Sequence, residues 1–180
     1  MDPAKTKFPF TQKINLGLDL QGGLYMVLGI DFNKVYRDVM SRQVNQVRET
    51  LKDKGVSVTG VKLVTDGLPS EDPHLLVNFE AANREKVYDA MKAAFWTMRL
   101  AGEKSGELEY GISREYRDDI RDRTLSQSIE VIRNRIDEFG VSEPAITSQG
   151  TDRIVVELPG VRDVQRAKDL RSEEHTSELQ

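Results

Sequence analysis

The sequence contains no cysteine, which excludes disulfides and thiolate chemistry but leaves the compartment open, because many exported domains also lack disulfides. It also lacks a long apolar run: the longest, Leu24–Ile30, is far shorter than the ~20 residues that span a bilayer. Its opening stretch, MDPAKTKFPF, has no apolar segment typical of a signal peptide. These absences alone would predict a cytosolic protein. The formal net charge of −4 argues against a nucleic-acid partner, which would require a basic surface.

Groups of side chains typical of catalysis or metal binding are also missing. Ser126 and Ser128 fall in a predicted helix without a plausible histidine partner. His74 has no second histidine nearby and no carboxylate array at metal-ligand spacing, so it is interpreted as structural or exposed. The carboxylates of residues 118–138 are interleaved with arginines, which favours exposed ion pairs. We therefore expect no enzymatic activity, no metal and no cofactor.

A glycine motif followed by an apolar strand is the most distinctive feature present. The motif consists of Leu16, Gly17, Leu18, Asp19, Leu20, Gln21, Gly22 and Gly23. Its leucines alternate with small or polar residues, which indicates an extended segment with one apolar face. The apolar run 24–30 after it is typical of a central strand covered on both faces. Asp19 is interpreted as fixing the turn by a hydrogen bond in preference to transferring protons.

The glycine spacing also resembles the start of a phosphate-binding loop. Gly17 and Gly22 have the required separation, but Gly23 stands where lysine is needed and Leu24 where serine or threonine is needed. Nucleotide binding is therefore disfavoured, and the glycines are interpreted as shaping the entry to the strand.

The first half of the chain alternates strands and helices. Apolar periodicity predicts, after the strand 24–31, a helix, two strands, a helix and a strand at about 33–54, 56–64, 75–80, 83–101 and 108–112. Asn33 and Asn83 are the predicted N-caps, and Gly55 ends the first helix. This order predicts an α+β fold of the split βαβ, ferredoxin-like kind: an antiparallel sheet with both helices on one face.

The second half has a helix, a hairpin and a further helix. Residues 113–124 are dense in charge and form either a linker or the first turns of a long helix, whose apolar seam runs from Leu125 to Phe139. Strands at 145–149 and 153–158 form the hairpin, and a last helix runs from Asp163 to Leu170. The strand 24–31 belongs either to this base-like half or to the head-like first half.

Two stretches resemble the SecD family, the accessory membrane subunit of the bacterial protein-export (Sec) machinery. LGLDLQGG with its apolar strand is the first, and Ile129–Lys168 agrees in order and spacing. The resemblance covers roughly 15–170; the SecF family shares the motif but fits the second stretch less well. It implies a preceding membrane helix, which this chain lacks, and a location on the periplasmic side of the bacterial inner membrane.

Composition, element order and the resemblance together predict four parts of the chain. Residues 1–14 are a loose lead, 15–112 a first α+β module with the head, and 113–170 a truncated, base-like second module. The last ten residues, RSEEHTSELQ at 171–180, do not continue the family pattern. They resemble the translation of a common sequencing adapter and are interpreted as non-native.

The implied function is assistance to protein export without enzymatic activity. The domain would contact the emerging unfolded polypeptide and change orientation in a proton-gradient-driven cycle, with flexible points near 31–33 and 111–113. Implied partners are a SecF-like subunit, a SecYEG-type translocon and the membrane, reached through helices missing here. The candidate polypeptide contacts are Val44, Phe95, Trp96 and Met98, whose helical spacing also fits ordinary core.

Two other functions remain as alternatives. One is a soluble regulatory module that binds a small ligand between ferredoxin-like units. The other is an RNA-binding domain, which is disfavoured because the strands 24–31 and 75–80 lack the aromatic and basic pattern needed for base stacking.

Overall fold

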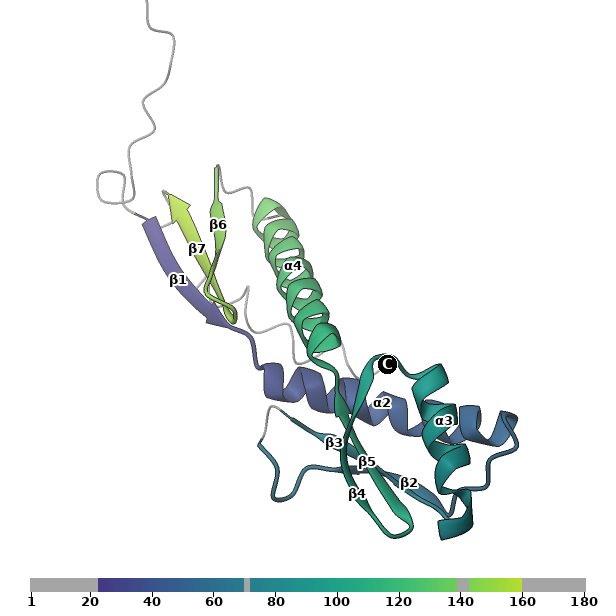
Figure 1. Cartoon of the computed structure of the whole chain (residues 1–180). Coiled ribbons are helices and arrows are strands. Elements are labelled where there is room, and N and C mark those ends of the chain that lie inside the picture. The colour runs from purple at the N-terminus through teal and green to yellow at the C-terminus, as the bar shows by residue number, and fades with distance from the viewer. Residues whose placement is uncertain (1–22, 70–71, 139–142, 160–180) are drawn as a thin grey trace, which may run out of the picture. The chain divides into compact units, whose positions relative to one another are not determined.

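The structure, a computed structural model, describes residues 23–69, 72–138 and 143–159 (Figure 1). Its elements within those ranges are β1 (Gly23–Gly29), α2 (Phe32–Asp53), β2 (Gly60–Val64), β3 (His74–Asn78), the 3-10 helix η1 (Ala81–Asn83), α3 (Arg84–Ala94), β4 (Met98–Lys104), β5 (Glu107–Ile112), α4 (Arg114–Glu138), β6 (Ala145–Gln149) and β7 (Arg153–Pro159). The predicted α+β class is confirmed. No helix within the described ranges is long and apolar enough to cross a membrane.

The strands form two sheets, with orders β2-β3-β5-β4 and β1-β7-β6. The described residues divide into two units: a head unit of residues 28–69, 72–130 and 148–154, and a base unit of residues 23–27, 131–138, 143–147 and 155–159. The head unit holds the four-stranded sheet, and the base unit holds the greater part of the three-stranded one. This division falls within α4, whereas the sequence placed the module boundary between β5 and α4.

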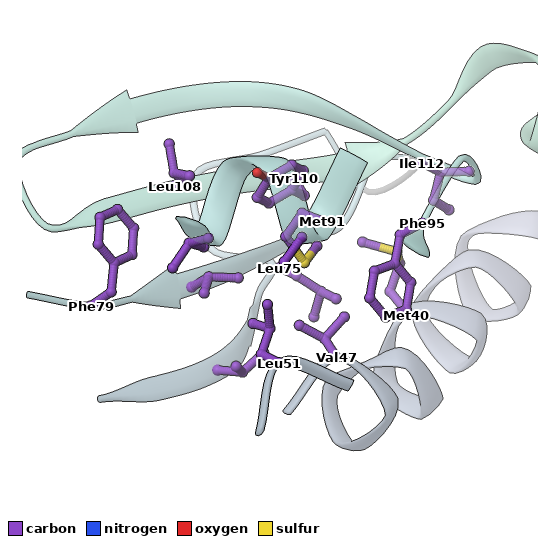
Figure 2. Packing of buried hydrophobic residues seen from close by; sticks show 14 of the residues in the cluster. Met40, Val47, Leu51, Leu75, Phe79, Met91, Phe95, Leu108, Tyr110 and Ile112 are labelled. Atoms are coloured by element: carbon purple, nitrogen blue, oxygen red, sulfur yellow. The ribbon is translucent and has the colours of Figure 1, made fainter. Parts of the chain in front are cut away.

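The core of the head unit lies on one face of the four-stranded sheet. The antiparallel register places Leu75 opposite Tyr110 and Val77 opposite Leu108, so these four side chains share a face. Helix α2 covers that face with Met40, Val47 and Leu51, and α3 with Val87 and Met91, all nearly inaccessible to solvent (Figure 2). Removal of this apolar surface from water is what stabilises the head unit.

Helix α2 begins and ends where short-range chemistry directs it. The side chain of Asp31 accepts a hydrogen bond from the backbone N–H of Lys34, so Asp31 caps the helix and the prediction of Asn33 was wrong by two residues. Asn33 already lies in the first turn. Gly55 follows the C-terminus with φ of 69°, as predicted for a glycine at this position.

The predicted helix 83–101 was wrong in its second half. Helix α3 ends at Ala94, and residues from Met98 onward form β4 instead. β4 pairs with β5 through a turn at Gly106, whose φ of 76° suits glycine. The pairing of β4 with the later strand β5 satisfies the backbone of both, and helical periodicity does not report such a contact between segments.

Strand β1 is not the doubly covered central strand that its apolar run predicted. It lies at one side of the three-stranded sheet, and its odd-numbered residues are exposed, with Tyr25 56% and Val27 47% accessible. Its neighbour is β7, which answers the question of which sheet it joins. The order β1-β7-β6 puts β7 between β1 and β6, which the head elements and α4 separate in sequence, and this is compatible with split βαβ; the full ferredoxin-like fold stays a prediction.

The charged residues 113–124 are the beginning of α4, the second of the two interpretations considered. Ser113 caps this helix: its Oγ accepts from the N–H of Tyr116 at 3.3 Å, and its carbonyl oxygen accepts from the N–H of Arg117 at 2.9 Å. Ile120 joins the head core, and Ile136 is fully buried. The predicted helix 163–170 lies outside the described residues.

Candidate functional site

The four predicted polypeptide contacts differ sharply in exposure. Phe95 is buried in the head core, whereas Val44 and Met98 are partly buried and pack against it. Trp96 is 71% exposed, the most accessible of the exposed large hydrophobic side chains in the described residues. Phe95 is thus packed in the core, whereas the ring of the next residue, Trp96, is exposed to solvent.

Trp96 does not extend alone into solvent. Its ring contacts that of Tyr116 edge to face, with the ring centres 5.9 Å apart. The backbone carbonyl of Thr97 accepts a hydrogen bond from the N–H of Ser113, which joins the segment after α3 to the start of α4. The resulting aromatic pair, Trp96 with Tyr116, is therefore supported by two elements of the head unit.

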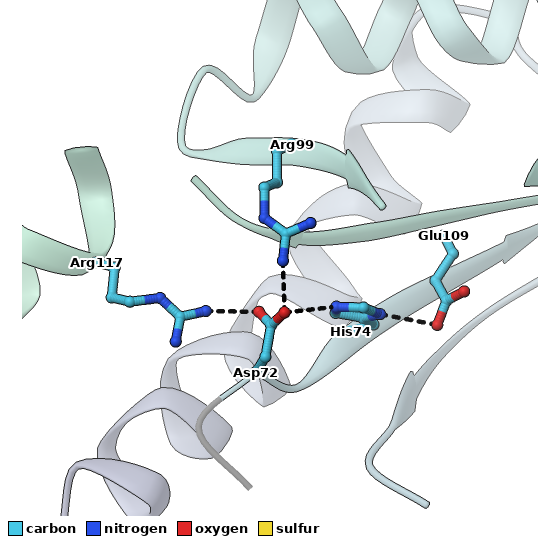
Figure 3. Close-up of polar contacts among 5 residues, drawn as sticks. All are labelled: Asp72, His74, Arg99, Glu109 and Arg117. Atoms are coloured by element: carbon cyan, nitrogen blue, oxygen red, sulfur yellow. Dashed lines mark hydrogen bonds and ion pairs between the residues drawn. The ribbon is translucent and has the colours of Figure 1, made fainter. Parts of the chain in front are cut away.

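A polar cluster gathers around Asp72, and its strand members His74, Arg99 and Glu109 alternate in register with the core residues Leu75 and Tyr110. Both ring nitrogens of His74 face carboxylates, Nδ1 at 2.8 Å from Glu109 and Nε2 at 3.1 Å from Asp72. Asp72 also accepts from the guanidinium groups of Arg99 and Arg117, one on each carboxylate oxygen (Figure 3). The cluster joins β3, β4, β5, α4 and the segment before β3.

The strand register explains why these side chains meet. Gly111 lies opposite His74 on one side and opposite Arg99 on the other. A Cβ atom at Gly111 would lie 3.0 Å from two atoms of the His74 ring and 3.2 Å from Cζ of Arg99. The absence of a side chain at Gly111 leaves the space in which His74 and Arg99 converge on Asp72.

Asp72 is the negative centre of this cluster. Burial by itself would raise the pKa of the Asp72 carboxyl, but the hydrogen bond to His74 and the charges of Arg99 and Arg117 outweigh burial and lower it. The ionised form is therefore the one that the folded head favours. His74 is only 7% exposed. Of the two interpretations considered, structural or exposed, the structural one agrees with this burial.

The sequence did not reveal the cluster, because its members come from five separate segments. The only local signal was Asp72 two residues before His74. Within the described residues there is no group of three or more His, Cys, Asp or Glu side chains that could hold a metal ion. The contacts within the cluster are ion pairs and hydrogen bonds.

Arginines of α4 also contact the aromatic rings at the start of α2. Cζ of Arg117 lies 5.0 Å from the ring centre of Tyr36, and Cζ of Arg121 lies 5.8 Å from that of Phe32. The two rings stack on one another at 5.9 Å. The start of α2, where the chain enters the head, and the start of α4, where it leaves, are therefore in contact near the predicted flexible points.

A shallow hollow of about 410 Å³ opens beside the polar cluster. It is lined by Pro69, Asp72, Arg99, Ile112, Arg114 and Arg117. The described residues of this lining include three arginines and one aspartate, so they carry a net positive charge although the whole chain has a net charge of −4. An anionic group is the complement that this lining favours.

Comparison with known proteins agrees with the two stretches that carried the resemblance. Residues 8–32 match the SecD/SecF GG motif, and residues 125–174 match the N-terminal part of the P1 domain of protein translocase subunit SecDF. "Protein translocase subunit SecD" of Anaeromyxobacter dehalogenans (strain 2CP-C) is 34% identical over 161 residues, which cover 87% of this chain and 25% of that protein. The chain belongs to the SecD family.

Other SecD proteins align over a similar region. That of Calditerrivibrio nitroreducens is 33% identical over 168 residues, covering 91% of this chain and 31% of its own length. That of Escherichia coli (strain K12) is 29% identical over 160 residues, covering 88% and 25%. This SecD-family chain therefore spans between a quarter and a third of these relatives. No solved structure gives a significant match.

The family motif itself lies mostly beyond the structural description. Leu16, Gly17, Leu18, Asp19, Leu20, Gln21 and Gly22 fall outside the described residues, and Gly23 is the first residue of β1. The SecD-family motif therefore leads directly into the strand that pairs with β7.

Proposed function

We propose that this SecD-family chain assists protein translocation by contacting unfolded polypeptide on the periplasmic side of the inner membrane. Membership of a family whose relatives are named protein translocase subunits supports the process. The observation that carries the contact is Trp96, which is 71% exposed although the neighbouring Phe95 is buried. An amphipathic aromatic ring in solvent can cover apolar side chains of many different sequences.

The proposed role is binding and reorientation without enzymatic chemistry. The head unit changes orientation in a proton-gradient-driven cycle, with a SecF-like subunit and a SecYEG-type translocon as partners. The polar cluster and the Arg117–Tyr36 contact support the view that the head moves as a rigid body, because they fasten its helices and strands to one another.

Binding of a labelled unfolded polypeptide tests the contact. A reduced and alkylated protein that stays unfolded is titrated with the chain, and its fluorescence anisotropy is followed. Trp96→Ala should weaken binding by about tenfold, since removal of an aromatic anchor typically costs more than 1 kcal/mol. Val131→Ala is the matched control: Val131 is also an exposed apolar residue but lies on α4, and its substitution should leave affinity unchanged. Equal affinity of both variants and the original chain would refute the proposed contact.

A further inference from the structure

The hollow beside Asp72 combines positive charge with access to solvent. The side chain of Arg99 is 43% exposed and that of Arg117 is 17% exposed, while that of Asp72 is 21% exposed. Arg114 is exposed and has no hydrogen-bond or ion-pair partner among the residues that the structure describes. Among the described residues that line the hollow, three arginines outnumber one aspartate, so this lining carries a net positive charge.

The hollow and the aromatic pair share the first turn of α4. Arg114 and Arg117 are three residues apart and therefore lie on one side of the helix, and Tyr116 lies between them in sequence. Tyr116 contacts Trp96, and β4, which begins two residues after Trp96, contributes Arg99 to the hollow. A cationic site and an exposed apolar site are thus built on the same two elements.

We propose that the hollow binds the carboxylate of an Asp or Glu side chain in an extended polypeptide, while an adjacent apolar side chain of that polypeptide packs on Trp96 and Tyr116. The proposal rests on the proposed function and adds the feature that the site recognises. One arginine guanidinium can donate two parallel N–H hydrogen bonds to a carboxylate. The helix dipole at the N-terminal end of α4 also favours a negative charge there.

A polypeptide fits these observations better than an anionic membrane surface. Electrostatic binding to anionic lipids typically requires clusters of four to eight Lys or Arg residues. The described lining has three arginines in a chain of net charge −4. Two of them, Arg99 and Arg117, already contact Asp72 (Figure 3). Its size of about 410 Å³ and the apolar Pro69 and Ile112 in its lining suit one or two side chains.

Trp96 provides a built-in reporter for the test, because it is the single tryptophan of the chain. Its emission is followed while the chain is titrated with an unstructured peptide of repeated Leu-Asp pairs separated by Gly-Ser linkers, and with the Leu-Asn counterpart. The Leu-Asp peptide should bind about fivefold more tightly, as expected for a partly exposed ion pair, and its advantage should fall with added salt. Arg114→Gln should abolish the difference between the peptides.

Arg123→Gln is the matched control, since Arg123 lies on the same helix with a 73% exposed side chain and pairs with Asp119. It should keep the preference for the Leu-Asp peptide. Circular dichroism checks that both variants are folded.

The outcomes separate this proposal from the proposed function. Equal binding of both peptides, lost in Trp96→Ala when followed by anisotropy, would overturn the carboxylate site and leave the polypeptide contact standing. Binding of neither peptide nor the unfolded protein would overturn both. Arg114-dependent binding of inorganic phosphate or of phosphatidylglycerol vesicles, without peptide binding, would overturn the proposal in favour of a general anion or lipid site.

Discussion

The guanidinium carbon of Arg117 lies 5.0 Å from the ring centre of Tyr36, and Nη2 of the same side chain donates to Asp72. One side chain of α4 therefore contacts both α2 and the segment before β3. Tyr36 is fully buried, so the cation covers a ring that also belongs to the head core. This arrangement makes the start of α4 part of the head unit and not a free linker.

Loss of this side chain should destabilise the head. Arg117→Gln removes a cation–π contact worth ~1 kcal/mol and a charge-assisted hydrogen bond worth ~1.5–3 kcal/mol, so the free energy of unfolding should fall by roughly 2.5–4 kcal/mol. Urea denaturation measures it. Arg123→Gln on the same helix breaks only an exposed pair and should cost less than about 0.5 kcal/mol. Similar losses for the two variants would contradict the assigned role of Arg117.

Asp72 should make stability depend on pH in the acid range. Burial opposes ionisation of its carboxyl, but the contacts of His74, Arg99 and Arg117 outweigh burial, so the folded-state pKa lies below the ordinary value of 3.8. The stabilisation is therefore fully present above pH 3.8 and is lost as pH falls through the folded-state pKa. The stability difference between the original chain and Asp72→Asn, measured by urea denaturation, should shrink below pH 3.8. A difference independent of pH would be inconsistent with this assignment.

Gly111 should resist substitution more than another strand glycine. In Gly111→Ala the new methyl group would lie 3.0 Å from the His74 ring, so the polar cluster must shift, at a cost of about 1–3 kcal/mol. Gly60→Ala is the matched control, since its Cβ would meet only Asn78 Nδ2 at an ordinary 3.7 Å. Thermal unfolding compares the two, and equal tolerance would show that the cluster is not closely packed around Gly111.

Removal of the Tyr110 hydroxyl should be neutral or stabilising. Burial raises the pKa of Tyr110, and its Oη is buried without a hydrogen-bond partner among the described residues. Tyr110→Phe deletes this unsatisfied group, so the free energy of unfolding should stay the same or rise by up to about 1 kcal/mol. The exposed Tyr25 offers the control variant Tyr25→Phe, expected to change stability by less than about 0.5 kcal/mol. A clear loss in Tyr110→Phe would reveal a hydrogen bond to its hydroxyl.

Local patterns predicted the elements whose signals lie close together in sequence. The stripe that includes Met40, Val47 and Leu51 correctly predicted α2, and the alternation of Ile154, Val156 and Leu158 correctly predicted β7. The predicted strand 56–64 is present as β2, although it begins only at Gly60. These successes rest on one buried face per element, which periodicity reports directly.

Features that depend on neighbouring elements were missed. Met98 has helical spacing to Val87 and Met91, yet residues 98–104 form β4 and pair with β5. The apolar run of β1 suggested burial on both faces, but only its sheet position shows that Tyr25 and Val27 are exposed. The Asp72 cluster joins five segments, so no local pattern could predict it. Trp96 was selected from sequence, and its exposure agrees with a contact that stays a prediction.

Photo-crosslinking at Trp96 tests the central proposal most directly. A benzophenone amino acid replaces Trp96 in one preparation and Val131 in another, and each is irradiated with the same polypeptide in unfolded and folded forms. The account predicts adducts at position 96 with the unfolded form and none above background with the folded form or at position 131. Equal crosslinking at both positions, or none with the unfolded polypeptide, would contradict a polypeptide contact at Trp96.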